Sequence, residues 1–366
     1  MRSVKVHLAD HRDYPIVIGQ NRLQELPLFL DQCLQQKEKK RRAVLVFVDE
    51  KVKSQGFELI NILSGRGFEI HSMIIPSGES SKSLAQLSTI YDFCAEKSLT
   101  RQTVVITLGG GVVGDLGGFV AATYNRGMDF IQIPTTLLAM VDSSVGGKVG
   151  INHSGGKNLI GAFHQPRGVW IDLNYLETLP QREFLSGLAE VVKYGVILDE
   201  SFFVYLEKNS QSIIAKENNI LQDIIQRSCE LKAEVVKNDE HELTGLRMIL
   251  NYGHTFAHAF ETISNYGELL HGEAVSIGMI VASRFAQMRG YISEEVTQRQ
   301  IRLLQTFNLP VKPKKEWETD QLIRIMKRDK KSTVGQLRLI LPTRIGEVKL
   351  FSDIEEREVK EVLQVR

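Results

Sequence analysis

The first half of the chain alternates short apolar runs with stretches of amphipathic character. The apolar runs stand at 4–8, 15–19, 43–50, 70–79, 102–111 and 129–136. The runs near 43–48 and 103–108 are almost continuous in apolar residues, which is typical of strands covered on both faces of a parallel sheet. This alternation predicts an N-terminal α/β domain of the doubly wound type, in which the glycine-rich turn follows a late strand.

The second half has a different periodicity. From about Asn174 strand signals vanish, and apolar residues recur at helical spacing over 182–197, 218–237 and 245–263. Near the end, residues 336–351 indicate two short strands around a Pro/Gly turn, that is, a small hairpin. We expect an α/β domain over 1–172 and a mostly helical domain over 173–366, with the boundary near Leu179–Pro180.

Composition agrees with two ordinary folded domains. The 366 residues exceed one typical domain, and 45 basic against 44 acidic residues give no global attraction for nucleic acid or an anionic membrane. The three cysteines, Cys33, Cys94 and Cys229, are widely spaced, which favours a reducing compartment. No stretch resembles a signal peptide or a membrane span. We therefore expect a cytoplasmic protein.

A strand, a glycine run and a helix follow one another around residue 110. Gly109, Gly111 and Gly114 satisfy the G-x-G-x-x-G spacing, which lets a diphosphate approach backbone N–H groups at a helix start. A tight strand-to-helix turn would give the same spacing. Two carboxylates favour a dinucleotide site: Asp115 near the helix start, where it could cap the helix or orient a ribose, and Asp49 at an earlier strand end. Asp49 precedes the glycines, whereas the standard fingerprint places its acid after them.

Three histidines gather within 18 positions. His254 and His258 lie four residues apart on a predicted helix, and His271 follows a predicted turn at Tyr266–Gly267. Imidazole is a common zinc ligand, and catalytic zinc sites often use three protein ligands. The alternative is that these histidines are structural. The residues alone leave a carboxylate ligand open among Glu190, Glu261 and Glu273.

Several cations lie beside glycines or within apolar helix patterns. They are Arg126, Lys148, Lys157, Lys193, Lys232, Arg247 and the pair Lys330–Lys331. Two GGK triplets place Lys148 and Lys157 on what we expect to be flexible backbone, suited to anchoring phosphate or carboxylate groups. Lys193 lies one helical turn from Glu190, and a surface ion pair would explain that spacing equally well. For any one lysine, exposure to solvent is the competing explanation.

Six segments together resemble the 3-dehydroquinate synthase family of sugar phosphate cyclases. They are 76–82, 109–127, 134–163, 187–195, 251–261 and 270–279, in the family's order. The resemblance is weakest in the first 40 residues and over 197–230. It implies a doubly wound NAD-binding domain, a mainly α-helical metal-binding domain and an active site between them. It also implies a homodimer and a place in the shikimate pathway of aromatic amino-acid biosynthesis.

The resemblance carries site residues over position by position. The implied ligands of one divalent metal ion, Zn²⁺ or Co²⁺, are Glu190, His254 and His271. The implied NAD contacts are Asp49, Ser77, Gly78, Glu79, Lys82, Gly110, Gly111, Val112, Val113, Gly114, Asp115, Thr135, Thr136, Lys148, Lys157 and Thr178. The implied substrate and catalytic residues are Arg126, Asp142, Lys148, Asn158, Lys193, Lys232, Arg247, Asn251, His258 and Lys330.

Some of these assignments carry further detail. The resemblance implies that His258 transfers protons, that Thr178 lies near the adenosine end of NAD and that Arg126 acts across the dimer interface. The segment 238–247 is longer than the family spacing, which leaves the register of Lys232 open. Whether Lys330 or Lys331 contacts the substrate is also open.

The implied reaction converts 3-deoxy-D-arabino-heptulosonate 7-phosphate to 3-dehydroquinate and phosphate. It combines transient oxidation by NAD, β-elimination of phosphate, return of the hydride and an intramolecular aldol closure. The competing functions are a sister cyclase acting on another sugar phosphate, a metal-dependent polyol dehydrogenase and a non-catalytic NAD- or metal-sensing protein.

Overall fold

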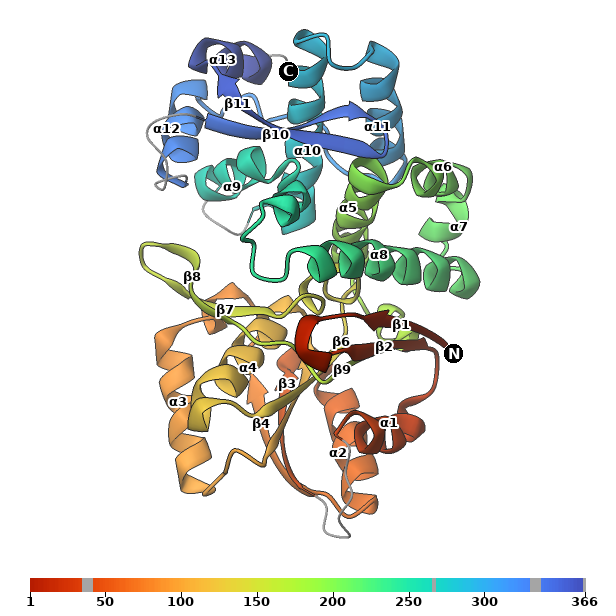
Figure 1. Cartoon of the computed structure of the whole chain (residues 1–366), viewed down its shortest axis with the longest axis vertical. Coiled ribbons are helices and arrows are strands. Elements are labelled where there is room, and N and C mark those ends of the chain that lie inside the picture. The colour runs from red at the N-terminus through yellow and green to blue at the C-terminus, as the bar shows by residue number, and fades with distance from the viewer. Residues whose placement is uncertain (35–41, 265–267, 330–336, 365–366) are drawn as a thin grey trace. The chain divides into compact units, whose positions relative to one another are not determined.

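A computed structural model describes residues 1–34, 42–264, 268–329 and 337–364. The chain forms two compact units. The first comprises Met1–Leu179 with Ser228–His241, and the second comprises Pro180–Arg227 with Glu242–Arg366. In Figure 1 the strands of the first unit run from red to yellow-green, and the elements of the second are green to blue.

A largely parallel sheet forms the centre of the first unit. Among the described residues, seven strands pair in the order β1-β2-β9-β6-β5-β3-β4, with β1 antiparallel to β2 and the other neighbours parallel. The strands are β1 (Arg2–Val6), β2 (Tyr14–Gly19), β3 (Ala43–Asp49), β4 (Glu69–Ile75), β5 (Val104–Gly109), β6 (Asp129–Pro134) and β9 (Gly168–Asp172). The predicted α/β class is confirmed, although the short apolar run that forms β9 was not predicted.

Helices cover both faces of this sheet. They are α1 (Leu26–Cys33), α2 (Lys53–Gly65), α3 (Leu84–Glu96) and α4 (Gly111–Thr123). A Cβ on Gly56 of α2 would lie 2.5 Å from Cγ1 of Val48, and one on Gly117 of α4 would lie 2.9 Å from Cδ2 of Phe47. Because adjacent strand residues point to opposite faces, α2 and α4 lie on opposite sides of β3. The arrangement is doubly wound, as predicted.

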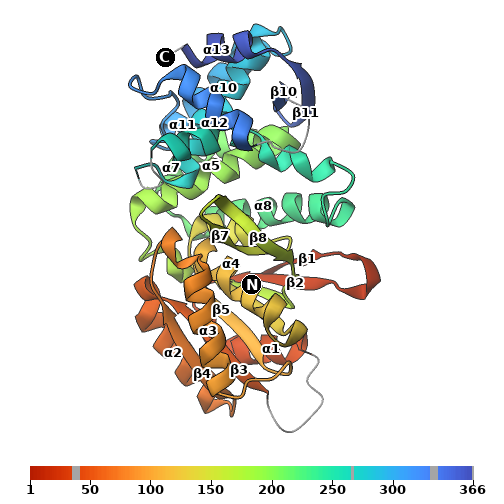
Figure 2. The same cartoon turned by 90° about the vertical axis from the view of Figure 1, so that its left-hand side faces the viewer.

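The segment with the two GGK triplets is not flexible backbone, so that expectation was wrong. It forms an antiparallel hairpin of β7 (Lys148–His153) and β8 (Gly156–Phe163), which lies beside α4 (Figure 2). Val149 and Ile151 are buried in the same core cluster as α4. Apolar burial on one side of the hairpin fixes its backbone, a tertiary effect that the local glycine content did not reveal.

The division into units is not a single cut in the chain. Helix α8 (Asn218–Asn238) begins in the second unit, and its last part, from Ser228, belongs to the first. Lys232 Nζ donates to the carbonyl oxygen and to Oδ1 of Asp142, both at 2.6 Å. Glu240 lies just beyond the helix, and Arg12 donates to both of its carboxylate oxygens, at 2.8 and 2.7 Å. These polar contacts hold residues 228–241 against the sheet unit.

The second unit is mainly helical, as predicted. Its elements are α5 (Gln181–Leu198), α6 (Glu200–Lys208), α7 (Ser210–Ile214), α9 (His254–Ile263), α10 (His271–Met288), α11 (Glu294–Thr306), α12 (Thr319–Asp329) and α13 (Glu356–Gln364), with strands β10 (Leu337–Arg344) and β11 (Glu347–Ile354). Helix α10 is buried along most of its length and packs against α5, α9 and α11. Strands β10 and β11 pair antiparallel, so the predicted hairpin is confirmed.

The helical pattern over 245–263 is interrupted. A short 3-10 helix, η8 (Leu246–Asn251), ends before Gly253, and α9 begins at His254. Gly253 has a φ of +78°, and a Cβ there would lie 2.7 Å from the backbone nitrogen of Met279. The turn and the close approach of α10 therefore both require glycine at this position. The predicted turn at Tyr266–Gly267 lies outside the described residues.

The described helices include none that is both long and apolar enough to cross a membrane.

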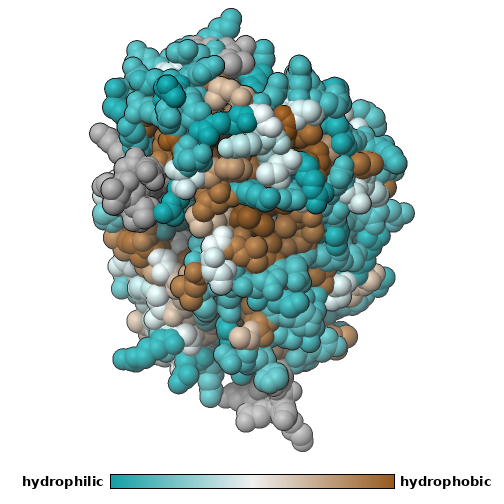
Figure 3. Space-filling view, turned by 45° about the horizontal axis from the view of Figure 1, so that its top comes forward, coloured by the Kyte–Doolittle hydropathy of each residue, from teal (hydrophilic) through white to brown (hydrophobic). Residues whose placement is uncertain are grey.

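Figure 3 shows one face of the molecule, on which an apolar area near the centre is bordered by hydrophilic residues. Several large apolar side chains are exposed, with Leu243 the most exposed at 85%. Single exposed apolar side chains, such as Leu243, are common on folded proteins.

The packing of α4 on the sheet gives a stability prediction. A Cβ on Gly117 would lie 2.4 Å from Cγ2 of Thr107, so Gly117→Ala should lower the free energy of unfolding by about 1–3 kcal/mol through overpacking. Urea denaturation measures this value. Gly65→Ala in α2 is the matched control, because no atom lies within 4 Å of its added Cβ and the protein should keep its stability or gain slightly. Equal effects of the two substitutions would contradict the packing argument.

Candidate active site

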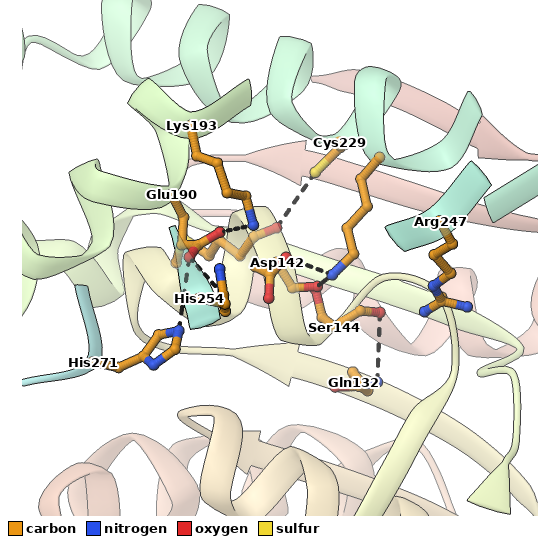
Figure 4. Close-up of polar contacts among 12 residues, drawn as sticks. Gln132, Asp142, Ser144, Glu190, Lys193, Cys229, Arg247, His254 and His271 are labelled. Atoms are coloured by element: carbon orange, nitrogen blue, oxygen red, sulfur yellow. Dashed lines mark hydrogen bonds and ion pairs between the residues drawn. The ribbon is translucent and has the colours of Figure 1, made fainter. Parts of the chain in front are cut away.

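Helix α5 carries an acidic and a basic side chain at buried positions. Glu190 has no exposed surface and Lys193 is 1% exposed, and the two form an ion pair. The apolar residues around them pack into the helical core, which places this polar pair inside the unit. A surface ion pair is therefore excluded. The buried carboxylate points toward the first residues of two other helices (Figure 4).

His254 is the first residue of α9 and faces Glu190. Its Nε2 lies 3.5 Å from Oε1 of Glu190, while its Nδ1 is 3.0 Å from the carbonyl oxygen of Tyr252. Since the carbonyl accepts only, Nδ1 carries the proton and Nε2 presents a lone pair toward the carboxylate. Burial, helped by the charge of Lys193, lowers the pKa of His254 to about 3. The ring is thus neutral at physiological pH, which is the form that binds metals.

His271 is the first residue of α10 and approaches the same carboxylate. Its Nε2 lies 3.7 Å from Oε1 of Glu190, and its Nδ1 lies 3.5 Å from Oε1 of Glu261. Burial favours the neutral ring, but the nearby carboxylates of Glu190 and Glu261 outweigh it and raise the pKa of His271 to about 10. The two carboxylates therefore give this site a negative charge that favours a cation beside the ring.

Glu190, His254 and His271 can hold a metal ion together. One ligand atom from each lies within 4.8 Å of the others. Among the described residues, these three form the group of His, Cys, Asp and Glu side chains that meets this distance. Two imidazoles and one carboxylate are a suitable donor set for zinc and similar ions, with room for a further ligand. The neutral His254 ring and the buried carboxylate fit such an ion.

The other candidates have different neighbours. His258 is exposed, and its ring centroid lies 5.7 Å from that of His254, so it lies beside the candidate ligand group, which does not include it. Glu273 binds Arg182 and accepts a hydrogen bond from the backbone N–H of Leu270, at the start of α10. Of the three glutamates left open by the sequence, only Glu190 joins the described ligand group.

Further predicted substrate residues lie in the helical unit. Arg247 of η8 is 2% exposed, and its Nε is 3.8 Å from Oε1 of Glu242. A guanidinium this buried provides a fixed positive charge at low flexibility. Asn251 is exposed at the end of η8. Lys330 and Lys331 lie outside the described residues.

In the sheet unit, the glycine turn joins β5 to α4 as predicted. A Cβ on Gly109 would lie 3.0 Å from Cβ of Asp49, and one on Gly110 would lie 3.2 Å from Cγ2 of Thr136. Ser77 donates to Oδ1 of Asp49 at 2.5 Å. The turn, β3 and β4 therefore bring these predicted NAD contacts to the carboxyl edge of the parallel sheet, where open α/β sheets bind ligands.

A second group of predicted NAD contacts forms one hydrogen-bonded network. Buried Lys82 donates to Oδ2 of Asp115 at 2.7 Å and to Oδ1 of Asn158 at 2.5 Å. Asp115 therefore pairs with Lys82 and does not cap α4, whose first turn has no acidic residue. Its pKa is raised by burial, against the opposing effect of Lys82.

Asn152 was not predicted, and it connects this network. It donates to Oε1 of Glu79 at 2.8 Å, and its Oδ1 accepts from the backbone N–H of Asn158 at 2.9 Å. No spacing signal marked Asn152 in the sequence, because its partners come from separate segments. Its amide holds Glu79 beside the hairpin.

The remaining predicted residues of the sheet unit differ in exposure. Asp142 lies on the π-helical turn η6 (Ala139–Ser143) and is held by Lys232, which places that lysine's side chain despite the altered spacing of 238–247. Arg126 is exposed at the end of η5 (Tyr124–Arg126), with a φ of +64°. The other predicted NAD contacts fall into three classes of exposure. Those exposed are Gly78, Lys148 and Thr178, those half-buried are Val112 and Lys157, and those buried are Val113, Gly114 and Thr135.

Comparison with known proteins places these features in a family. Models of the 3-dehydroquinate synthase N-terminal and C-terminal domains match residues 72–186 and 187–332. The 3-dehydroquinate synthase of Desulforamulus reducens is 48% identical over 365 residues, covering 99% of each chain. That of a Shewanella species is 43% identical over 362 residues, again covering 99% of each chain.

Two solved structures share the whole architecture. The 2-epi-5-epi-valiolone synthase of Streptomyces hygroscopicus, with NAD⁺ and Zn²⁺ bound, is 29% identical with a TM-score of 0.85, covering 96% of this chain and 95% of that one. A 2-deoxy-scyllo-inosose synthase, complexed with carbaglucose-6-phosphate, NAD⁺ and Co²⁺, is 25% identical with a TM-score of 0.88 and 99% coverage of each chain. Together with the two matching domain models, these similarities show that the chain belongs to the 3-dehydroquinate synthase family.

Proposed function

We propose that this chain is an NAD- and metal-dependent lyase that converts 3-deoxy-D-arabino-heptulosonate 7-phosphate to 3-dehydroquinate and phosphate. The family match over the full chain supports this reaction. The structural observation that carries it is the convergence of Glu190, His254 and His271 in the helical unit. A cyclase needs such a centre because the oxygen atoms of a polyol must be polarised during the reaction.

When bound, NAD supplies reversible hydride transfer and the divalent ion supplies electrophilic polarisation. Glu190, His254 and His271 would hold the ion, and the two imidazoles with one carboxylate accept either Zn²⁺ or Co²⁺. The carboxyl edge of the sheet, with Asp49, the glycine turn and the Lys82 network, would hold NAD. Both relatives of known structure bind NAD⁺, one with Zn²⁺ and the other with Co²⁺, which supports this assignment.

The cations of the chain suit a substrate with one phosphate and one carboxylate. Lys193, Lys232 and Arg247 are all buried, so their charges act in a medium of low dielectric constant and keep fixed positions. We assign them to binding the substrate anions and to stabilising the negative charge that develops during elimination. His258, exposed beside His254, is placed to exchange protons with the substrate or with water.

The protein's surroundings follow from the same proposal. We expect it to act in the cytoplasm as a step of aromatic amino-acid biosynthesis, and its free cysteines Cys33, Cys94 and Cys229 are compatible with that reducing compartment. We also expect a homodimer in which Arg126 reaches the partner's substrate. Its exposure on a left-handed turn supports this role.

The proposed reaction returns its hydride, and this separates it from its competitors. With the heptulosonate phosphate and trace NAD, we expect phosphate release to exceed the NAD supplied by many turnovers without accumulation of NADH. A coupled phosphate assay and NADH absorbance measure both quantities. NADH accumulating in step with substrate loss would indicate a polyol dehydrogenase, and turnover only of a sugar phosphate without a carboxylate would indicate a sister cyclase.

The ligand assignment predicts the effect of His271→Ala. Losing one of three protein ligands should weaken metal binding by more than about 100-fold, beyond the effect of losing an outer partner, and should abolish turnover. Metal content after gel filtration and competition with a chelator measure the binding. His7→Ala, at an exposed histidine of the sheet unit, should retain metal and activity. An active His271→Ala protein with full metal content would refute the assignment.

Complementation tests the proposed role of Arg126. Arg126→Ala and His271→Ala should each be inactive alone, yet their co-expression should restore about one quarter of normal activity, because half of randomly paired dimers would contain one intact site. Activity per purified dimer measures the recovery. No recovery from a mixture shown to contain heterodimers would place Arg126 in the site of its own chain.

A further inference from the structure

A second buried carboxylate lies beside the metal ligands. The side chain of Glu261, on α9, is 7% exposed, and its Oε1 lies 3.5 Å from Nδ1 of His271. A carboxylate withdrawn from water to this extent requires a compensating donor or charge. The imidazole Nδ1–H of His271 supplies one.

The position of Glu261 follows from the register of α9. His254 begins this helix, and Glu261 is seven residues later, so the two side chains lie on the same helical face two turns apart. A single helix therefore supplies one metal ligand directly and places a carboxylate against the ring of another. Because α9 is one rigid element, the spacing between these two groups is fixed.

The contact determines which nitrogen of His271 faces the metal position. A carboxylate accepts only, so it holds a ring proton on Nδ1, and Nε2 is the nitrogen left to bind a cation on the Glu190 side. It also increases the basicity of Nε2, because negative charge behind the ring favours the donation of electron density to a cation. A ring without this partner would be able to rotate or to change its tautomer.

His254 has a partner of a different kind. Its Nδ1 faces the carbonyl oxygen of Tyr252, and the hydroxyl of Tyr252 lies 2.9 Å from both the carbonyl oxygen of Met279 and Oε1 of Gln300. Backbone and buried side chains thus anchor this ligand through a neutral acceptor. His271, in contrast, has a charged acceptor, which makes its binding strength depend on the charge of one side chain.

We propose that Glu261 is a positioning residue that orients His271 through Nδ1 and sets the affinity of the centre for its divalent ion. The inference rests on the metal centre of the proposed function. It assigns Glu261 to the support of a ligand and excludes it from direct coordination, although the sequence left it open as a ligand.

The test compares metal affinity in the full-length protein and its variants. Glu261→Gln keeps the shape and a hydrogen-bond acceptor but loses the charge, so we expect Zn²⁺ binding to weaken by about 10-fold, and by about 100-fold in Glu261→Ala. Competition of Zn²⁺ with a fluorescent chelator measures both values. Glu273→Gln is the matched control: it removes a carboxylate charge two residues from His271, where the partners are Arg182 and the Leu270 N–H, and it should leave affinity unchanged.

Further readings distinguish positioning from general stability. Thermal unfolding in excess chelator should give the same midpoint for Glu261→Gln and the unaltered protein. The visible spectrum of Co²⁺ bound to the variant should be shifted relative to that of Co²⁺ bound to the unaltered protein. Unchanged affinity in both Glu261 variants would overturn the inference while leaving the metal centre intact. A loss of affinity matched by an equal loss of stability without metal would also overturn it. Absence of Zn²⁺ binding in the unaltered protein would overturn the metal centre itself.

Discussion

The burial of one carboxylate organises the helical unit. Glu190 is completely withdrawn from solvent, and a charge in that position is tolerated only when other groups compensate it. Lys193 does so from the same helix, and the rings of His254 and His271 approach from the first residues of two other helices. Helices α5, α9 and α10 therefore meet at one point, around this carboxylate.

Such convergence requires the backbones to approach closely, and glycines of α10 make it possible. A Cβ on Gly272 would lie 1.8 Å from the carbonyl oxygen of Ser186 on α5, and one on Gly278 would lie 2.2 Å from the carbonyl oxygen of Gly253. Neither position admits a side chain without backbone movement. The same two contacts set the depth at which His271 and His254 sit beside Glu190.

The sheet unit also brings polar side chains from several elements together at one place. Its polar residues follow the carboxyl ends of β3, β4 and β5, and the hairpin β7–β8 adds Asn152 and Asn158 to them. Lys82 lies at the centre of this group, because Asp115 and Asn158 both accept from its ammonium. Here too, the functional groups come from the ends of rigid elements, which position them with little freedom.

The sequence by itself determined the classes of structure and chemistry. Continuous apolar strands predicted the doubly wound sheet, helical spacing predicted the second unit, and the spacing of glycines and histidines predicted a nucleotide turn and a metal site. These signals are local, since each depends on residues within one element or its immediate neighbours. Tertiary structure alone decided the rest: the hairpin at Lys148–Phe163, the break at Gly253, the attachment of residues 228–241 to the sheet unit and the different partners of Glu190, Glu261 and Glu273. The physical reason is that a carboxylate becomes a ligand, a support for a ligand or a helix cap according to which donors lie within about 3–4 Å, and those donors come from distant parts of the chain.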